Sequence, residues 1–390
     1  MTYYPLMKNN ITKDDLSTII NFLSKDDIRL TQGEKVKTFE NAWSKWLGVK
    51  HSVFVNSGAS ANLISISLLK HFFPEGGEII VPPLTWSSDI FSVIRNGFTP
   101  VFVDVTLKNL AINPNLLEEK ISKNTRCIFL THAQGYNGLN DKILEIIKNR
   151  NIWLIEDVCE SHGAKFNDKR LGTFGHLSNF SFYYAHHLST IEGGMICTDN
   201  DDFNDLLRAY RSHGLVREMQ GEETRQKWIK GNKDLNPEFV FAVPGYNMRS
   251  TELNAVIGIN QLLRLDENIN LRNKNNNKFL SGLNSEIFYV EFDLVGQSNY
   301  AFNLIFNNKE KDKRDKLERN LNSANIEFRR GSAGGGNQIR QPYVKKLIDN
   351  INPEDYPVCD HIHFYGYYIG NYPDLDLKSI DYILDVIHDI

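Results

Sequence analysis

Short apolar runs alternate along the first half of the chain with longer segments whose apolar residues recur every three or four positions. Continuous apolar runs of this length predict strands that are buried on both faces of a sheet. The expected strands are 52–55, 78–81, 100–105, 126–132, 152–157, 179–183 and 194–198. The helical periodicity predicts helices over 60–71, 87–96, 141–149 and 201–212. This alternation indicates an α/β fold in which a mostly parallel sheet is sandwiched by helices.

The last third of the chain has a different pattern. After one long helical pattern over 250–270, the expected elements are a strand over 300–306, a helix over 311–324, a strand over 326–329 and a Gly-rich loop over 331–337. We therefore expect a large domain, 1–265, and a smaller C-terminal α+β domain, 266–390.

Two stretches of this part are less clear. The Asn/Lys-rich stretch 273–278 fits either an exposed helix face or a loop. The pattern His361-Ile362-His363 is typical of the alternation of a strand.

Composition and charge narrow the function classes. Hydrophobic residues make up 41% of the 390 residues, charged residues 24%, and the formal net charge is -4. This balance predicts neither nucleic acid nor a membrane surface as a partner. The first residues carry no basic segment followed by an apolar run, and no apolar run approaches the ~18 residues of a membrane span. We expect a cytoplasmic enzyme.

The four cysteines, Cys127, Cys159, Cys197 and Cys359, are far apart and form no CxxC or CxC pair. A zinc site or a disulfide framework is therefore not predicted. Cys127 and Cys197 fall in expected strands, where buried free thiols are common. The adjacent residues His186 and His187 lack the spacing of a metal site, so we predict no metal.

Polar residues follow the carboxyl ends of several expected strands, where parallel sheets bind ligands. The segment 55–62, VNSGASAN, joins a strand to a helix, and its small residues let backbone N–H groups approach an anion. Ser57 or Ser60 could equally be a helix N-cap.

An acidic residue and an aromatic residue follow two other strands. Asp157 ends the strand 152–157, and its carboxylate could pair with a protonated pyridine nitrogen or serve a loop. Trp86 follows the strand 78–81 and could stack on a flat cofactor ring or cap the core of the sheet.

The segment 181–194, SFYYAHHLSTIEGG, resembles the cofactor-anchoring segment of sugar aminotransferases that use pyridoxal phosphate (PLP). In those enzymes a lysine lies five residues after the serine, and here that position is His186. An imidazole cannot form the Schiff base that a lysine amine forms with an aldehyde, but it moves protons near neutral pH. The exchange indicates another reaction of the same cofactor.

These segments together, in this order, resemble the DegT/DnrJ/EryC1/StrS family, a group of fold-type I PLP-dependent enzymes that act on nucleotide sugars. The resemblance runs from about residue 33 to residue 373. It implies that Ser57, Gly58, Ala59 and Ser181 hold the cofactor phosphate. It also implies that Asn247 reaches the phosphate of a neighbouring subunit, and therefore a homodimer with shared active sites.

The resemblance also implies how the cofactor ring is held. Trp86 would stack on the pyridine ring and Asp157 would pair with its nitrogen. Glu160, where most members of the family carry glutamine, would lie near the ring hydroxyl.

Within the family, histidine in place of the lysine marks a branch of sugar 3-dehydratases, and the segments 184–187, 336–343 and 370–373 resemble that branch. One kind of member is an iron–sulfur enzyme with clustered cysteines, and the other needs no metal. The scattered cysteines favour the second kind. The resemblance then implies pyridoxamine phosphate (PMP) as the resting cofactor, a nucleotide-linked 4-keto sugar as substrate, L-glutamate as amino donor and His186 as the base.

Two other functions stay open at this point. One is a sugar aminotransferase that uses another lysine, although no lysine lies between Lys169 and Lys227. The other is an inactive relative that binds a nucleotide sugar. GDP against CDP also stays open, because the sequence does not settle the nucleotide. Hexose against heptose stays open because the loop 331–337 is longer than is usual in the branch.

Overall fold

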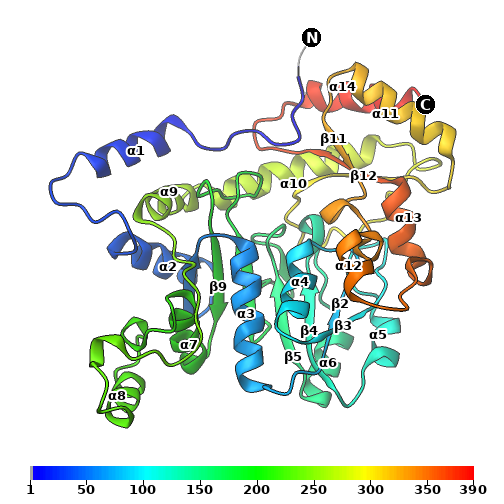
Figure 1. Ribbon diagram of the computed structural model, residues 1–390. Coiled ribbons are helices and arrows are strands. Elements are labelled where there is room, and N and C mark those ends of the chain that lie inside the picture. Colours follow the sequence, from blue (N-terminus) through cyan, green and yellow to red (C-terminus); the bar gives the residue numbers. More distant parts are fainter. Residues whose placement is uncertain (1–2) are drawn as a thin grey trace.

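A seven-stranded sheet forms the centre of the larger unit (Figure 1). The computed structural model describes residues 3–390. The strands of this sheet are β1 (His51–Val55), β2 (Glu78–Val81), β3 (Thr99–Phe102), β4 (Thr125–Thr131), β5 (Trp153–Asp157), β8 (Leu177–Ser181) and β9 (Gly194–Thr198). Their order is β1-β9-β8-β5-β4-β2-β3, and β9 runs antiparallel to both of its neighbours whereas the other pairs are parallel. The predicted mostly parallel sheet is confirmed.

Helices cover both faces of this sheet. One face carries α3 (Gly58–Phe72), α4 (Ser87–Arg95) and α7 (Asp201–Arg211), and the other carries α2 (Glu34–Leu47), α5 (Pro114–Lys120), α6 (Asp141–Arg150) and α9 (Glu252–Leu262). Successive strand residues point to opposite faces, so Val53 and Val55 pack with the first group of helices and Phe54 packs with the second. Burial on both faces explains why the strands are continuously apolar. The remaining elements of this part are α8 (Glu222–Gly231) and the hairpin β6 (Lys165–Phe166) and β7 (Lys169–Arg170).

A smaller unit lies beyond the carboxyl ends of the parallel strands (Figure 1). Its antiparallel sheet has the order β10 (Ala301–Ile305), β12 (Gly366–Gly370) and β11 (Phe328–Arg330). Its helices are α10 (Leu265–Gly282), α11 (Lys311–Ser323), α12 (Pro342–Leu347), α13 (Pro357–Tyr365) and α14 (Leu377–His388). Its apolar core includes Leu84, Val105 and Tyr136 from loops of the large unit. We propose the boundary between residues 265 and 266, at the start of α10.

The long helix expected over 250–270 is divided in the structure. The helix α9 ends at Leu262, and α10 begins at Leu265 after two tight turns, in which the N–H groups of Leu263 and Arg264 bond to carbonyls three residues back. Arg264 turns its guanidinium toward Asp15, and this contact accompanies the change of direction. Apolar spacing alone could not reveal the break, because the apolar pattern continues across it.

The prediction of a strand at His361-Ile362-His363 is wrong, because these residues lie in α13. Pro357 begins the helix, and the Asp104 carboxylate accepts the N–H groups of Val358 and Cys359 at 2.9 Å. This cap comes from a single residue more than 250 positions away in the sequence. The stretch 273–278 lies within α10, where Asn275 and Asn276 are buried rather than on an exposed helix face.

The helix α1 (Lys13–Leu23) lies apart from both sheets and crosses α9 (Figure 1). Among residues 3–390, no helix combines the length and the apolar character that crossing a membrane would require.

Candidate active site

The start of α3 forms the first part of the site. Ser57 is the N-cap, and its Oγ accepts a hydrogen bond from the Ser60 N–H at 3.1 Å. The N–H groups of Gly58 and Ala59 have no partner within the helix and lie at its positive end. A Cβ on Gly58 would come within 2.6 Å of the Ser181 Cβ, so backbone alone fits between the two segments. The predicted phosphate-binding residues of this chain therefore lie together, and Ser57 is also a helix cap.

Asp157 lies at the carboxyl end of β5 and is 3% exposed. Its Oδ1 accepts the Cys159 N–H at 2.9 Å, and its Oδ2 accepts the Asn62 side-chain amide at 3.1 Å. The same Asn62 amide donates to Asp89 Oδ1 at 2.6 Å. Asn62 thus joins the start of α3, the end of β5 and the helix α4.

Asp89 is the second carboxyl group of this cluster. Burial, together with the nearby Asp157 charge, raises the pKa of Asp89 well above its usual range. The hydroxyls of Thr85 and Thr131 both donate to Asp89 Oδ2, the second at 2.8 Å. This shift favours the protonated form of Asp89 beside Asp157. An Asp157 carboxylate is the partner that a protonated pyridine nitrogen would need.

Trp86 immediately precedes α4 and is 58% exposed. This exposure excludes the alternative of a core tryptophan and leaves the indole available for stacking. The Gly-rich loop of the small unit packs against the residues that precede Trp86. Leu84 pairs with Asn337, and the Gln338 N–H donates to the Pro83 carbonyl at 2.9 Å. The loop therefore borders the Trp86 side of the site.

His186 lies in the loop between β8 and β9, residues 182–193, which we call the His186 loop. Its backbone N–H donates to the Tyr183 carbonyl at 3.0 Å. The partly buried imidazole has its centroid 5.9 Å from that of His162 and 5.6 Å from that of Tyr300. Among the described residues, no group forms a hydrogen bond with its Nδ1. The ring is therefore held by contacts and by its backbone.

The surroundings of His186 keep its imidazole neutral. Burial lowers the pKa of His186 to about 4, with Asp157 opposing this shift and the buried Arg272 adding to it. Arg272 donates to the backbone carbonyls of Tyr300 and Asn371. A neutral imidazole at pH 7 can accept a proton, and once protonated it gives the proton up readily.

Glu160 forms another wall of the site together with a residue that we did not predict. Burial, with the Asp157 charge adding to it, raises the pKa of Glu160 to about 7, and Glu160 Oε2 accepts the Gln134 N–H at 2.8 Å. Gln134 is fully buried, has φ of 57°, and both polar atoms of its side-chain amide lack a partner among the described residues. Strained residues of this kind cluster at functional sites. Its position just after β4 was the available sequence signal.

Asn247 lies on the surface beside the chain that enters the start of α3. Its Oδ1 accepts the Arg249 Nε–H at 3.2 Å, and the next residue, Met248, accepts the Asn56 N–H at 3.1 Å. The side chain is exposed. Its predicted reach to a neighbouring subunit stays a prediction.

The cysteines form no cluster in three dimensions. All four are free thiols, and Cys127 and Cys197 are buried in strands, as predicted. Within residues 3–390, no group of three His, Cys, Asp or Glu side chains is arranged to hold a metal ion.

The site fits PLP or PMP. The start of α3 offers an anion cradle, whose space would be filled if residue 58 carried a Cβ. Asp157 offers a buried carboxylate, and Trp86 offers an exposed flat ring. All three lie at the carboxyl ends of strands of the central sheet or follow them in the chain: the cradle follows β1, Asp157 ends β5 and Trp86 follows β2. A phosphate, a ring nitrogen and a ring face therefore each have a matching group.

Replacing Gly58 by alanine should weaken cofactor binding, because the new Cβ would overlap Ser181 and displace the helix start. Overpacking costs about 1–3 kcal/mol, which corresponds to about a 5- to 150-fold rise in the Kd for PMP. Equilibrium dialysis with PMP measures this change. The matched control is Gly231→Ala, where the new Cβ would meet open space among residues 3–390. An unchanged Kd in Gly58→Ala would exclude the cradle.

Comparisons with known proteins agree with a site for PLP or PMP. Residues 9–388 match the DegT/DnrJ/EryC1/StrS aminotransferase family. The chain is 34% identical over 392 residues to GDP-4-keto-6-deoxy-D-mannose 3-dehydratase of Escherichia coli O55:H7, covering 99% of this chain and 100% of that protein.

Two solved structures are similar over nearly the whole chain. One is a His-to-Asn mutant of GDP-4-keto-6-deoxymannose-3-dehydratase with bound GDP-perosamine, with a TM-score of 0.89, 33% identity, and coverage of 98% of this chain and 100% of that chain. The other is GDP-4-keto-6-deoxymannose-3-dehydratase with a trapped PLP-glutamate geminal diamine, with a TM-score of 0.88, 32% identity, and coverage of 98% and 100%.

Proposed function

Because the chain belongs to the DegT/DnrJ/EryC1/StrS aminotransferase family, we propose that it is a PLP/PMP-dependent 3-dehydratase of a nucleotide-linked 4-keto-6-deoxy sugar. The single observation that carries this proposal is His186, which replaces the lysine in a site whose cradle, acid and indole are retained. The proposed substrate is GDP-linked, as the names of the similar proteins indicate, and the product is a 3,6-dideoxy-4-keto sugar.

Each of these residues of the site would have its own role in the reaction. When bound, PMP supplies an amine for the 4-keto group and a ring that accepts electrons from its C4′ carbon. His186 would take the C4′ proton, since burial favours its neutral imidazole, and would then give a proton to the departing C3 hydroxyl. Asp157 would hold the ring nitrogen, Trp86 the ring face, and Glu160 would lie near the ring hydroxyl.

The missing lysine makes cofactor retention depend on non-covalent contacts. Ser57, Gly58, Ala59 and Ser181 would hold the phosphate through backbone N–H groups and hydroxyls. L-Glutamate is the proposed amino donor that restores PMP, and a similar structure contains a PLP-glutamate adduct.

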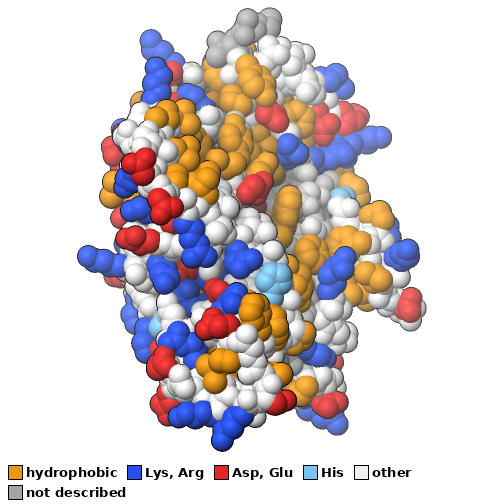
Figure 2. Space-filling view, turned by 60° about the vertical axis from the view of Figure 1, so that its left-hand side comes forward, with side chains coloured by type: hydrophobic (Ala, Val, Ile, Leu, Met, Phe, Trp, Pro, Cys, Tyr) orange, Lys and Arg blue, Asp and Glu red, His pale blue; other side chains and the backbone are white. Residues whose placement is uncertain are grey.

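We also propose a homodimer with shared active sites. Large apolar side chains are exposed on α1, in the His186 loop and in the segment before α9; they include Ile20, 62% exposed, Ile191, 55%, and Phe241, 56%. Figure 2 shows hydrophobic side chains gathered in the upper part of the face that it presents. Burial of such a surface by a second copy would bring Asn247 toward another subunit. The four free thiols suit a reducing compartment, and we propose the cytoplasm.

Product analysis tests the proposed function. The PMP-loaded protein is given GDP-4-keto-6-deoxymannose and L-glutamate, with CDP-linked and heptose-containing 4-keto sugars in parallel reactions. Release of ammonia together with a 3-deoxy-4-keto sugar is the expected result. Formation of an amino sugar would indicate an aminotransferase. Binding of the sugar nucleotide with no turnover across the panel would indicate an inactive relative.

A further inference from the structure

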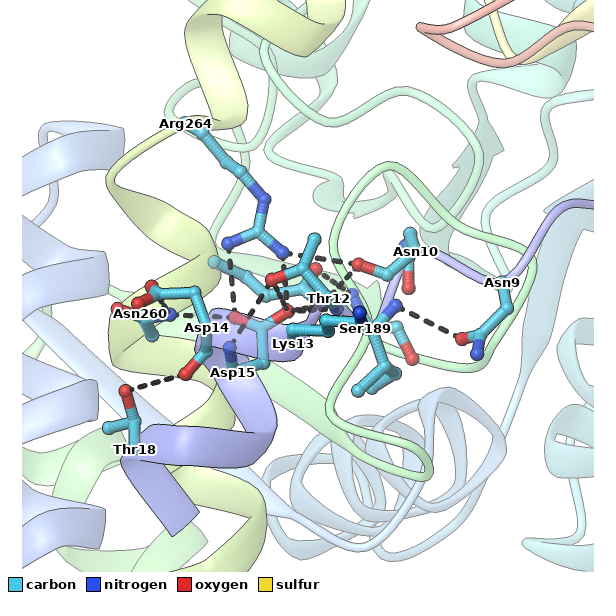
Figure 3. Close-up of polar contacts among 12 residues, drawn as sticks. Asn9, Asn10, Thr12, Lys13, Asp14, Asp15, Thr18, Ser189, Asn260 and Arg264 are labelled. Atoms are coloured by element: carbon cyan, nitrogen blue, oxygen red, sulfur yellow. Dashed lines mark hydrogen bonds and ion pairs between the residues drawn. The ribbon is translucent and has the colours of Figure 1, made fainter. Parts of the chain in front are cut away.

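The N-terminal segment that precedes α1 lies beside the His186 loop, on the side where Ser189 lies (Figure 3). The side-chain amide of Asn10 donates to the backbone carbonyl of His186 at 3.2 Å. The backbone carbonyl of Asn10 in turn accepts Gln261 Nε2 and Arg264 Nη2, each at 3.1 Å. Asn10 therefore links the junction of α9 and α10 to the carbonyl of His186.

A buried carboxylate organises these donors. Asp15 has no exposed surface, and it accepts Arg264 Nη1 at 3.0 Å and Nη2 at 2.5 Å. Asn260 donates to it at 2.8 Å and Gln261 at 3.2 Å. Burial alone would raise the pKa of Asp15, but the hydrogen bonds from Arg264 and Thr12 lower it below its usual range. An ionised, fully bonded carboxylate fixes its donors strongly.

Gln261 gives the same cluster a second contact with the loop. Its Oε1 accepts the Ser189 N–H at 3.1 Å, and the residue is 3% exposed. The loop is thus held on both sides of His187, at His186 by Asn10 and at Ser189 by Gln261. Both contacts depend on residues distant in the sequence.

The backbone contact matters because the imidazole has little polar support of its own. The Nδ1 atom of His186 has no hydrogen-bond partner in the described part of the chain. A lysine at this position would be tethered by its bond to the cofactor, whereas a histidine is not. The direction of the imidazole therefore follows the conformation of the loop, and a reacting group displaced by about 1 Å can lose about 10²-fold in rate.

We propose that Asn10 is a positioning residue for His186, and that the Asp15–Arg264–Gln261 cluster holds Asn10 in place for this role. This inference rests on the proposed function for its kinetic consequence. The contact itself, from the Asn10 amide to the His186 carbonyl, is independent of any substrate.

The kinetic test is Asn10→Ala in the PMP-loaded enzyme. We expect kcat to fall about 10- to 100-fold, with KM and the Kd for PMP changed less than about twofold, since Asn10 acts through the orientation of the base. The matched control is Asn9→Ala, because exposed Asn9 makes a local hydrogen bond, accepting the Ile11 N–H at 3.0 Å. An unchanged kcat in Asn10→Ala would overturn the proposal.

A double-mutant cycle separates positioning from a general structural role. In the background of His186→Asn, Asn10→Ala should have no further effect on the residual rate, because the group that it positions is gone. A loss of the same factor in both backgrounds would overturn the proposal.

Hydrogen exchange of the cofactor-free protein provides a readout that needs no activity. Peptides covering residues 183–190 should exchange at least about tenfold faster in Asn10→Ala than in Asn9→Ala, because local opening becomes easier. Unchanged exchange would overturn the positioning contact. If the wild-type protein dehydrates none of the sugars, the proposed function fails while the exchange result still decides this inference.

Discussion

Replacing His186 by asparagine is expected to slow 3-dehydration by about 10²- to 10⁴-fold, the range that general acid–base groups contribute. Asparagine keeps a polar side chain in the loop but cannot take a proton from the cofactor C4′ carbon. The Kd for PMP should stay close to that of the wild type, because the cradle at the start of α3, Asp157 and Trp86 are unchanged. Single-turnover reactions with pre-bound PMP measure the rate. The control is the exposed His71→Asn on α3, which should leave it unchanged.

The pH dependence of the wild-type rate examines the same assignment. Burial lowers the pKa of His186 to about 4, so the base form persists well below the ordinary histidine value of about 6.5. The part of kcat/KM that depends on His186 should therefore stay constant from pH 8 down to about pH 5 and fall only at lower pH. A fall of the wild-type kcat/KM to half its maximum near pH 6.5, with no such fall in His186→Asn, would contradict a buried, neutral base.

Replacing His186 by lysine tests its position rather than its proton chemistry. A lysine amine in this place should form a covalent bond with PLP, and dehydration should stop. Borohydride reduction followed by mass spectrometry of the peptide that contains residue 186 detects the bond. A PLP-loaded variant without a covalent adduct would show that His186 does not occupy the place of the family lysine.

Replacing Asp157 by asparagine should slow dehydration about 10²- to 10³-fold, as expected when one preorganised electrostatic partner is removed. Asparagine has nearly the same shape, so it keeps an acceptor for the Cys159 N–H but loses the charge that the ring nitrogen requires. Binding of the cofactor should weaken by about 1.5–3 kcal/mol, the usual contribution of a hydrogen bond to a charged group.

Two measurements distinguish these effects of Asp157→Asn. Equilibrium dialysis gives the Kd for PMP, and kcat at saturating PMP isolates the loss in chemistry. Asp168→Asn, in an exposed turn with φ of 63°, is the control for a generic loss of charge. A kcat equal to that of the wild type at saturating PMP would exclude the pairing of Asp157 with the ring nitrogen.

The central sheet could be predicted because its signal is local. Each strand is a continuous apolar run, so β2 and β9 were predicted with the bounds that the structure shows, and the others differ by up to three residues. Periodicity failed where a distant residue determines the backbone. The break between α9 and α10 coincides with the contact of Arg264 with Asp15, and Asp104 caps the helix that contains His361 and His363.

Parts of the site were accessible from the sequence for a different reason. Small residues, an acid and an indole each follow a strand end, and the topology of a parallel sheet collects such residues at one edge. Gln134, Asn62 and Asp89 were missed because their role lies in what they contact. Asn62 sits inside a helix pattern, and only the structure shows its amide between Asp89 and Asp157.

The sequence by itself determined the class of the sheet, the family resemblance and the presence of an imidazole where a lysine would carry the cofactor. These depend on residue types and their order, which are written in the chain. The tertiary structure alone decided that Trp86 is exposed, that His186 is neutral, and that Asn10 holds the carbonyl of His186. Exposure, pKa and long-range hydrogen bonds arise from burial and from neighbours far apart in sequence, so no local pattern can carry them.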